Sequence, residues 1–196
     1  MTSFLPRFDT EFFPRLSERG PTFRLMFEFL EMRHQGPYLI VETGTARQPG
    51  NWLDGQSTVL FDQFVQLHGG SVYSVDINAE ACAAARTITS PQTHVVCNDS
   101  VRFLWDFCKG GRPIDLLYLD SYDLNVQDPF PSAFHHVKEL TACIASLQRG
   151  TLIAIDDNLL QPDGRRVGKG MLVSQFLQEI GASRLMDSHQ TLWMLA

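Results

Sequence analysis

Acidic and amide side chains recur along this chain, each time directly after a short apolar run. Five such runs are followed by residues able to bind a ligand or an ion: Glu42-Thr43-Gly44, Asp76, Asn98-Asp99-Ser100, Asp120 and Asp156-Asp157-Asn158. In open α/β sheets, ligands bind in the crevice beyond the carboxyl ends of the strands. The same residue types also cap the helix that follows a strand, and Asp99 or Ser100 could serve only as a cap. Five clusters in succession nevertheless predict one shared site.

The first two clusters suit a nucleoside. Asp76 follows the second apolar run, where a carboxylate can accept hydrogen bonds from both hydroxyls of a ribose. The first run leads into the turn Glu42-Thr43-Gly44-Thr45-Ala46, whose glycine lets the backbone approach a ligand closely. This turn has neither the G-x-G-x-x-G pattern of dinucleotide sites nor the G-x-x-x-x-G-K-[ST] loop of NTPases. These residues favour an adenosine-type ligand without a pyrophosphate.

The last two clusters suit a cation. Asp120 ends the fourth apolar run, and Asp156-Asp157-Asn158 ends the fifth. If these strands are adjacent, three carboxylates and an amide meet, and such a group repels itself unless a positive charge offsets it. Oxygen ligands favour Mg²⁺, Ca²⁺ or Mn²⁺ over zinc. We therefore expect a divalent cation, with Mg²⁺ as the first choice.

Two adjacent histidines are candidates for a general base. His135 and His136 fall in the first turn of a helix expected from Ser132 to Leu147, and the pKa of histidine suits proton transfer near neutral pH. Adjacent helical residues point about 100° apart, so only one of the two can reach the crevice. A structural role for the pair has equal weight. The role of His189, near the C-terminus, is left open.

Two loops carry further candidates. The segment Arg47–Asp54 could form a lid over the site, or Trp52 could anchor it by packing. The basic, glycine-rich segment Gln161–Gly170 could bind an anionic substrate group at a helix N-terminus, or it could be a solvated loop.

The elements that must position these residues alternate along the chain. Apolar runs predict strands at Tyr38–Val41, Val72–Val75, His94–Cys97, Ile114–Leu119 and Leu152–Ile155. Helical periodicity covers Thr22–Arg33, Ser57–Leu67, Ala79–Arg86, Val101–Cys108, Ser132–Leu147 and Val167–Ile180. Near-continuous apolar strands separated by helices indicate a parallel sheet covered on both faces.

The end of the chain differs from this alternation. Residues Arg184–Met186 and Thr191–Leu195 flank a turn and predict a terminal antiparallel hairpin. The expected fold class is therefore α/β, a doubly wound Rossmann-like and mostly parallel seven-stranded sheet with a C-terminal antiparallel hairpin. We expect one domain over residues 1–196, in which residues 1–21 form an irregular N-terminal extension containing Pro6 and Pro14.

Composition narrows the function classes. The chain has 196 residues, 44% of them hydrophobic, and a net charge of −6, and 14 of its 22 acidic residues are aspartate. An acidic chain disfavours a broad phosphate-binding surface and hence nucleic acid. No apolar stretch reaches the ~20 residues that span a bilayer, and the N-terminus lacks a signal sequence, which predicts a cytoplasmic protein without a membrane partner. We expect the cysteines to be buried free thiols: Cys82, Cys97, Cys108 and Cys143.

The ordered set of motifs resembles the class I S-adenosylmethionine-dependent methyltransferases. The segments that match are Val41-Glu42-Thr43-Gly44-Thr45-Ala46, Ser74-Val75-Asp76-Ile77, Asn98-Asp99-Ser100 and Asp115-Leu116-Leu117-Tyr118-Leu119-Asp120. The resemblance implies that adenosine lies against Gly44, Asp76 and Asp99, and that methionine lies near Glu42, Thr45 and Ser57. Ala46, Ile77 and Ser100 belong to the same motifs and complete the implied cofactor site.

The acidic clusters resemble the metal-dependent O-methyltransferases in particular. In those enzymes an Asp ending the fourth strand and an Asp-Asn pair ending the fifth hold the metal, which Asp120, Asp157 and Asn158 match. Such an ion would lower the pKa of a substrate hydroxyl, and the resulting oxyanion could attack the methyl group. Those enzymes tend to place a lysine three residues after the first Asp, where this chain has Asp123. The remaining catalytic candidates are Asp120, His135 and His136.

These observations predict transfer of a methyl group from S-adenosylmethionine to a hydroxyl of a small molecule, helped by a divalent cation. One alternative is a nucleic-acid methyltransferase, but Asp120-Ser121-Tyr122-Asp123 is not the Asn/Asp-Pro-Pro-Tyr element of amino-group modifiers. Another is a non-catalytic cofactor-binding or assembly protein on the same fold, kept open by the missing lysine. A homodimer is also left open.

Overall fold

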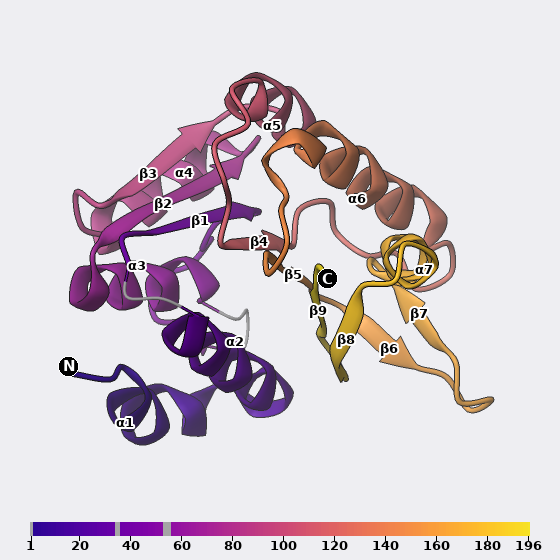
Figure 1. Ribbon diagram of the computed structural model, residues 1–196, viewed down its shortest axis with the longest axis horizontal. Coiled ribbons are helices and arrows are strands. Elements are labelled where there is room, and N and C mark those ends of the chain that lie inside the picture. The colour runs from indigo at the N-terminus through magenta and orange to yellow at the C-terminus, as the bar shows by residue number, and fades with distance from the viewer. Residues whose placement is uncertain (1, 34–35, 53–55) are drawn as a thin grey trace.

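A computed structural model describes residues 2–33, 36–52 and 56–196 and shows a seven-stranded sheet with the order β3-β2-β1-β4-β5-β9-β8 (Figure 1). The strands are β1 (Tyr38–Thr43), β2 (Gly70–Asp76), β3 (Thr93–Cys97), β4 (Leu116–Leu119), β5 (Leu152–Ile155), β8 (Ser183–Asp187) and β9 (Thr191–Met194). Strands β1 to β5 run parallel, whereas β9 is antiparallel to both β5 and β8. The predicted fold class and its C-terminal antiparallel hairpin are confirmed.

The register of the sheet brings the polar clusters to one edge. Thr43 of β1 lies opposite Val75 of β2 and Leu119 of β4, and Leu119 lies opposite Ile155 of β5. The strand order reverses between β1 and β4, and α/β sheets open a crevice at such a reversal. The residues that follow these four strand ends therefore surround this crevice.

Two apolar layers cover the central strands. The helices are α2 (Gly20–Arg33), α3 (Ser57–His68), α4 (Ala79–Ile88), α5 (Ser100–Cys108), α6 (Phe130–Ala142) and α7 (Met171–Glu179). Apolar residues of α2 and α3 pack with Ile40 of β1, and those of α5, α6 and α7 pack with Leu39 and Val41. Successive strand residues point to opposite faces, so both faces of β1 are buried.

The N-terminal segment differs from the irregular extension expected for residues 1–21. It forms successive helical turns: α1 (Leu5–Arg7), the π-helical turn η1 (Phe8–Phe12), and the 3₁₀ turns η2 (Phe13–Arg15) and η3 (Ser17–Arg19). Phe4, Phe8, Phe12 and Leu16 are buried in the core that α2 and α3 share. Their spacing of four is helical, and the prolines are compatible with it because proline fits the first turn of a helix.

Two predicted helices have different bounds. Val167, where a helix was expected to begin, lies instead in the strand β7 (Arg166–Gly168). This strand forms an antiparallel hairpin with β6 (Asn158–Leu160), and the helix α7 starts only at Met171. The helix expected to continue to Leu147 ends with α6 at Ala142, and the 3₁₀ turn η5 (Ile144–Ser146) follows it.

Three cysteines are buried free thiols as expected, but Cys97 is exposed at the end of β3. Among the described residues, no helix combines the length and apolar character needed to cross a membrane.

Candidate cofactor and acceptor site

Two adjoining cavities lie at the carboxyl ends of the parallel strands. The first has a volume of about 600 Å³, and Asp76, Asp99 and His135 are among its lining residues. The second has a volume of about 360 Å³ and is partly lined by Arg19 and Asp157. Four residues line both cavities: Gly44, Arg47, Asp120 and Asp123. The crevice therefore has two compartments with a common wall.

The structure brings eight of the nine predicted cofactor residues to these cavities. Those that line the first are Gly44, Asp76, Ile77, Asp99 and Ser100. Those that line the second are Gly44, Thr45, Ala46 and Ser57. Glu42 lines neither, because it is fully buried beneath the turn that follows β1.

Gly44 lets this turn approach β4. Its φ is +82°, and an added Cβ would lie 2.8 Å from the carbonyl oxygen of Asp120. The Gly44 amide donates to the carbonyl of Val75 at 2.8 Å, which joins the turn to β2. Both the left-handed backbone and the close contact require glycine here.

Two backbone amides fix the carboxylate of Asp76. Thr45 donates to its Oδ2 at 3.1 Å, and Asn78 donates to its Oδ1 at 2.8 Å. Each carboxylate oxygen has a second lone pair, so the group can still accept hydrogen bonds from a diol in the first cavity.

Asp99 has the capping role anticipated from the sequence, since its side chain accepts from the Arg102 amide at 2.8 Å at the start of α5. It nevertheless also lines the first cavity.

Glu42 stabilises the turn from below. Its Oε2 accepts from the hydroxyls of Thr58 at 2.7 Å and Ser74 at 2.5 Å. Thr58 in turn accepts from the Ala46 amide at 2.9 Å. Burial raises the pKa of Glu42 to about 7, against the opposing effect of the hydroxyl hydrogen bonds. Glu42 therefore acts on the cavity wall through Thr58 rather than by direct contact.

Only one of the two adjacent histidines reaches the crevice. His135 lines the first cavity, with its Nε2 3.0 Å from the Ser100 hydroxyl and 3.3 Å from a carboxylate oxygen of Glu139. His136 is fully buried, its Nδ1 lies 2.6 Å from the carbonyl oxygen of Ser132, and burial lowers its pKa. The inclusion of His136 among the catalytic candidates is thus corrected, because no substrate in either cavity could contact it.

The predicted metal ligands Asp120 and Asp157 are joined by a lysine. Lys169 Nζ lies 2.7 Å from Asp120 Oδ1 and 2.9 Å from Asp157 Oδ2. It also donates to the backbone carbonyl of Asp120 at 3.1 Å, and its side chain is only 1% exposed. Burial opposes its charge, but the carboxylates of Asp120 and Asp157 raise the pKa of Lys169 above its ordinary value.

An arginine from the N-terminal segment neutralises the other side of this cluster. Arg19 lies 2.8 Å from Asp156 Oδ2 and 3.2 Å from Asp157 Oδ1. Asp156 also accepts from the Tyr118 hydroxyl at 2.8 Å. Burial alone would raise the pKa of Asp157, but His189, Lys169 and Arg19 together hold it well below its usual range.

Solved structures share this architecture. The calicheamicin methyltransferase CalS11 is 12% identical over 89% of this chain and 77% of its own, with a TM-score of 0.60. The mycinamycin-pathway methyltransferase MycE, in complex with Mg and SAH, is 16% identical over 99% of this chain and 54% of its own, with a TM-score of 0.63. A candidate rRNA methylase from Clostridium thermocellum is 13% identical over 90% and 95%, with a TM-score of 0.56. The fold is that of a class I methyltransferase.

No family model matches the chain, and no curated protein matches it. At 12 to 16% identity, the similarity extends to the methyltransferase fold alone.

The residues at the expected metal position do not fit a divalent cation. The Lys169 ammonium already lies between Asp120 and Asp157. The amide of Asn158 is committed to backbone groups, because its Oδ1 accepts from Gly170 at 2.9 Å and its Nδ2 donates to Ile155 at 2.9 Å. The side-chain oxygens expected to bind a metal ion are therefore already engaged in ion pairs or hydrogen bonds within the protein.

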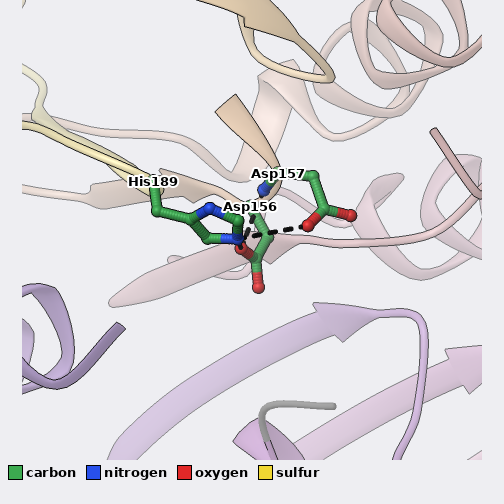
Figure 2. A group of neighbouring side chains, drawn as sticks. All are labelled: Asp156, Asp157 and His189. Atoms are coloured by element: carbon green, nitrogen blue, oxygen red, sulfur yellow. Dashed lines mark hydrogen bonds and ion pairs between the residues drawn. The ribbon is translucent and has the colours of Figure 1, made fainter. Parts of the chain in front are cut away.

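A second acidic group has the spacing of a metal site. Figure 2 shows the His189 ring facing the carboxylates of Asp156 and Asp157, and one ligand atom from each residue lies within 4.8 Å of the others. His189 Nε2 lies 3.4 Å from Asp156 and 3.3 Å from Asp157. Arg19 pairs with Oδ2 of Asp156 and with Oδ1 of Asp157, and the latter oxygen also faces His189. A cation of the chain is therefore already paired with both carboxylates of this group.

Sequence reasoning missed Arg19 and Lys169. Arg19 lies far from the strand ends in the sequence, and no local pattern marks it. Lys169 had a weak signal, since it stands between Gly168 and Gly170 within a segment expected to bind an external anion. Its partners are instead carboxylates of the chain itself.

The loop that follows the turn at Gly44 is anchored at Trp52. The Trp52 ring stacks on Phe12 with centroids 5.7 Å apart, and the Arg15 guanidinium lies 5.3 Å from its centre. Of the two interpretations of this loop, packing of Trp52 is confirmed, while residues 53–55 lie outside the described residues. Arg47, in the same loop, pairs with Asp123 at 2.5 Å where the two cavities meet.

Proposed function

We propose that this protein transfers a methyl group from S-adenosylmethionine to a hydroxyl of a small molecule. The observation that carries the proposal is the pair of adjoining cavities that share Gly44 and Asp120. One compartment has the residues to hold a nucleoside, and the other has room for an acceptor of limited size. Their common wall is where a methyl group would pass between them.

The first cavity supports cofactor binding. The fixed carboxylate of Asp76 would accept the ribose hydroxyls, and Ile77, Asp99 and Ser100 would surround the adenine. The methionine portion would extend past Gly44 toward the second cavity. Its sulfonium would then lie at the common wall of the two cavities, with its methyl group toward the second cavity.

The second cavity supports the chemistry. The acceptor oxygen attacks the methyl carbon, the bond from that carbon to sulfur breaks, and S-adenosylhomocysteine leaves. The hydroxyl proton passes to the carboxylate of Asp120, which lines both cavities. His135 lines only the first of them and is the second choice as the base. Binding both reactants in line supplies a large part of the rate enhancement.

Transfer of a labelled methyl group to a panel of hydroxylated small molecules, in the presence of a chelator, tests the proposal. We expect turnover by the wild type and a loss of about 10²-fold or more in Asp120→Asn, the usual contribution of a general base. Asp106→Asn, at an exposed ion pair on α5, is the matched control and should keep full activity.

Two other outcomes would replace the proposal. Methylation of RNA but not of small molecules would favour a nucleic-acid methyltransferase. One of the similar structures is described as a candidate rRNA methylase. The net charge of −6 of this chain weighs against such an activity. Cofactor binding without transfer to any acceptor would favour a non-catalytic binding or assembly protein.

A further inference from the structure

The ammonium group of Lys169 is surrounded by oxygen. It donates to carboxylate oxygens of Asp120 at 2.7 Å and Asp157 at 2.9 Å, and to the Asp120 carbonyl at 3.1 Å. A lysine ammonium has three hydrogens, so these three acceptors satisfy it completely. With 1% of its side chain exposed, Lys169 has no donor left for a substrate.

The backbone around Lys169 is built to hold it in this position. Lys169 donates its amide to the Asp157 carbonyl at 3.2 Å, and Gly170 donates to the Asn158 side chain. A Cβ on Gly168 would lie 1.9 Å from the Asp157 carbonyl oxygen, and a Cβ on Gly170 would lie 2.5 Å from Asn158 Oδ1. Glycine on both sides therefore allows the corner between β7 and α7 to pack directly against the end of β5.

Cations of the chain offset most of the negative charge around this position. Three carboxylates, those of Asp120, Asp156 and Asp157, face two permanent cations, Lys169 and Arg19. His189 lies beside the same carboxylates, and the neighbouring Asp157 raises its pKa. A divalent cation added to this group would have to displace a buried, fully hydrogen-bonded ammonium.

The contacts of Lys169 have the lengths of strong ionic hydrogen bonds. Its Nζ lies 2.7 Å from Asp120 Oδ1 and 2.9 Å from Asp157 Oδ2, the usual range for an N–H···O bond to a carboxylate.

We propose that Lys169 is the resident cation of this site: its ammonium takes the position between Asp120 and Asp157 that the resemblance to metal-dependent O-methyltransferases assigns to a divalent ion. The site then binds no Mg²⁺. Lys169 is a positioning residue, because it orients the Asp120 carboxylate without contacting the substrate.

This arrangement restricts the acceptor, a consequence that rests on the proposed function. A metal ion can bind two neighbouring oxygens of an acceptor such as a vicinal diol, whereas the saturated ammonium of Lys169 binds none. The acceptor must be held by the cavity walls instead, and it should need only a single hydroxyl near Asp120.

Titration with Mn²⁺, followed by the loss of the electron paramagnetic resonance signal of the free ion, tests this inference. We expect no bound Mn²⁺ in the wild type or in Lys138→Ala, a surface lysine of α6 that serves as the control. Lys169→Ala removes the ammonium and leaves Asp120 and Asp157 facing each other. This variant should bind one Mn²⁺ per chain, and Mg²⁺ should displace it and raise the melting temperature.

Two results would overturn the inference. One is a Mn²⁺ ion bound by the wild type and lost in Asp120→Asn, because Asp120 belongs to this position and not to the neighbouring group of Asp156, Asp157 and His189. The other is a Lys169→Ala variant that is folded by circular dichroism but binds no Mn²⁺. Folding of Lys169→Ala only in the presence of Mg²⁺ would also support the inference. The titration of the wild-type protein needs no variant and decides by itself whether the site binds Mn²⁺. None of these measurements uses S-adenosylmethionine, so a failure of the proposed function would be seen separately.

Discussion

A buried carboxyl group lies directly under the turn that would hold the cofactor. Glu42 is fully buried, and it links β2, α3 and the turn through hydroxyl groups. Among the described residues its Oε1 has no hydrogen-bond partner. An ionised carboxylate is poorly accommodated in such a place, which is why burial favours the protonated form.

Glu42 should make the stability of the protein depend on pH. Its pKa rises from 4.5 to about 7 on folding, so the folded state binds the proton more tightly between these values. Stability is therefore greatest below the unfolded pKa and is lost as the pH rises through the folded pKa. The loss is about 3 kcal/mol at ~1.4 kcal/mol per unit of pKa. Denaturant unfolding across this range should show a clearly smaller fall in Glu42→Gln than in the wild type.

The control for this experiment is Glu179→Gln, at an exposed position in α7. It should keep the wild-type pH dependence. An unchanged slope in Glu42→Gln would show that the carboxyl group is already ionised in the folded protein.

Gly44 should be intolerant of even one added carbon. Gly44→Ala places a Cβ 2.8 Å from the Asp120 carbonyl and forces a left-handed backbone on alanine. We expect a loss of about 2 kcal/mol or more in the free energy of unfolding, together with weaker cofactor binding. Gly110→Ala is the matched control, since nothing lies within 4 Å of its added Cβ. Equal stability of the two variants would contradict the close contact between the turn and β4.

At the scale of elements, the N-terminal helical segment does more than cover the sheet. Its phenylalanines pack into the core, with the Phe4 ring 4.9 Å from Phe27 and 5.6 Å from Phe64. This packing fixes the end of the segment, where Arg19 pairs with Asp156 and Asp157. The segment therefore contributes both to the core and to the charge balance of the crevice.

Removing one ring from this segment should destabilise the whole fold. Phe8 is 0% exposed, and Phe8→Ala should cost about 3 to 5 kcal/mol in the free energy of unfolding. Phe134→Ala provides the comparison, because this phenylalanine of α6 is 54% exposed and its loss should cost within about 0.5 kcal/mol. If chemical denaturation gave Phe8→Ala the stability of the wild type, the segment would not be part of the core.

The strands were predictable from the sequence because they are buried on both faces and appear as continuous apolar runs. The N-terminal segment was not, because Pro6 and Pro14 obscured a helical spacing of buried residues. The hairpin of β6 and β7 was missed because its strands have three residues each, too short for a pattern.

The same contrast holds for the candidate site. Residues that follow strand ends, such as Asp76 and Asp120, could be placed because the topology of the sheet brings strand ends together. Arg19 and Lys169 reach the crevice from elements that follow no such rule. Their contacts depend on how the N-terminal segment and the β7–α7 corner pack, which sequence periodicity does not encode.

For the molecule as a whole, the excess of aspartate does not create an open anionic crevice. Asp120, Asp156 and Asp157 are paired with Arg19 and Lys169, whereas Asp76 and Asp99 face the first cavity. The crevice thus has a neutralised end beside the second cavity and a carboxylate-lined end suited to a nucleoside. This division supports the proposal that the first compartment binds the cofactor and the second the acceptor.

Calorimetric titration with S-adenosylmethionine measures whether the first cavity binds this cofactor through Asp76. We predict one bound cofactor per chain for the wild type and for Asp163→Ala, an exposed control in the β6–β7 hairpin, and loss of binding in Asp76→Ala. A folded wild-type protein that gives no heat of binding, or an Asp76→Ala variant that binds as tightly as the wild type, would rule out a cofactor site built on Asp76.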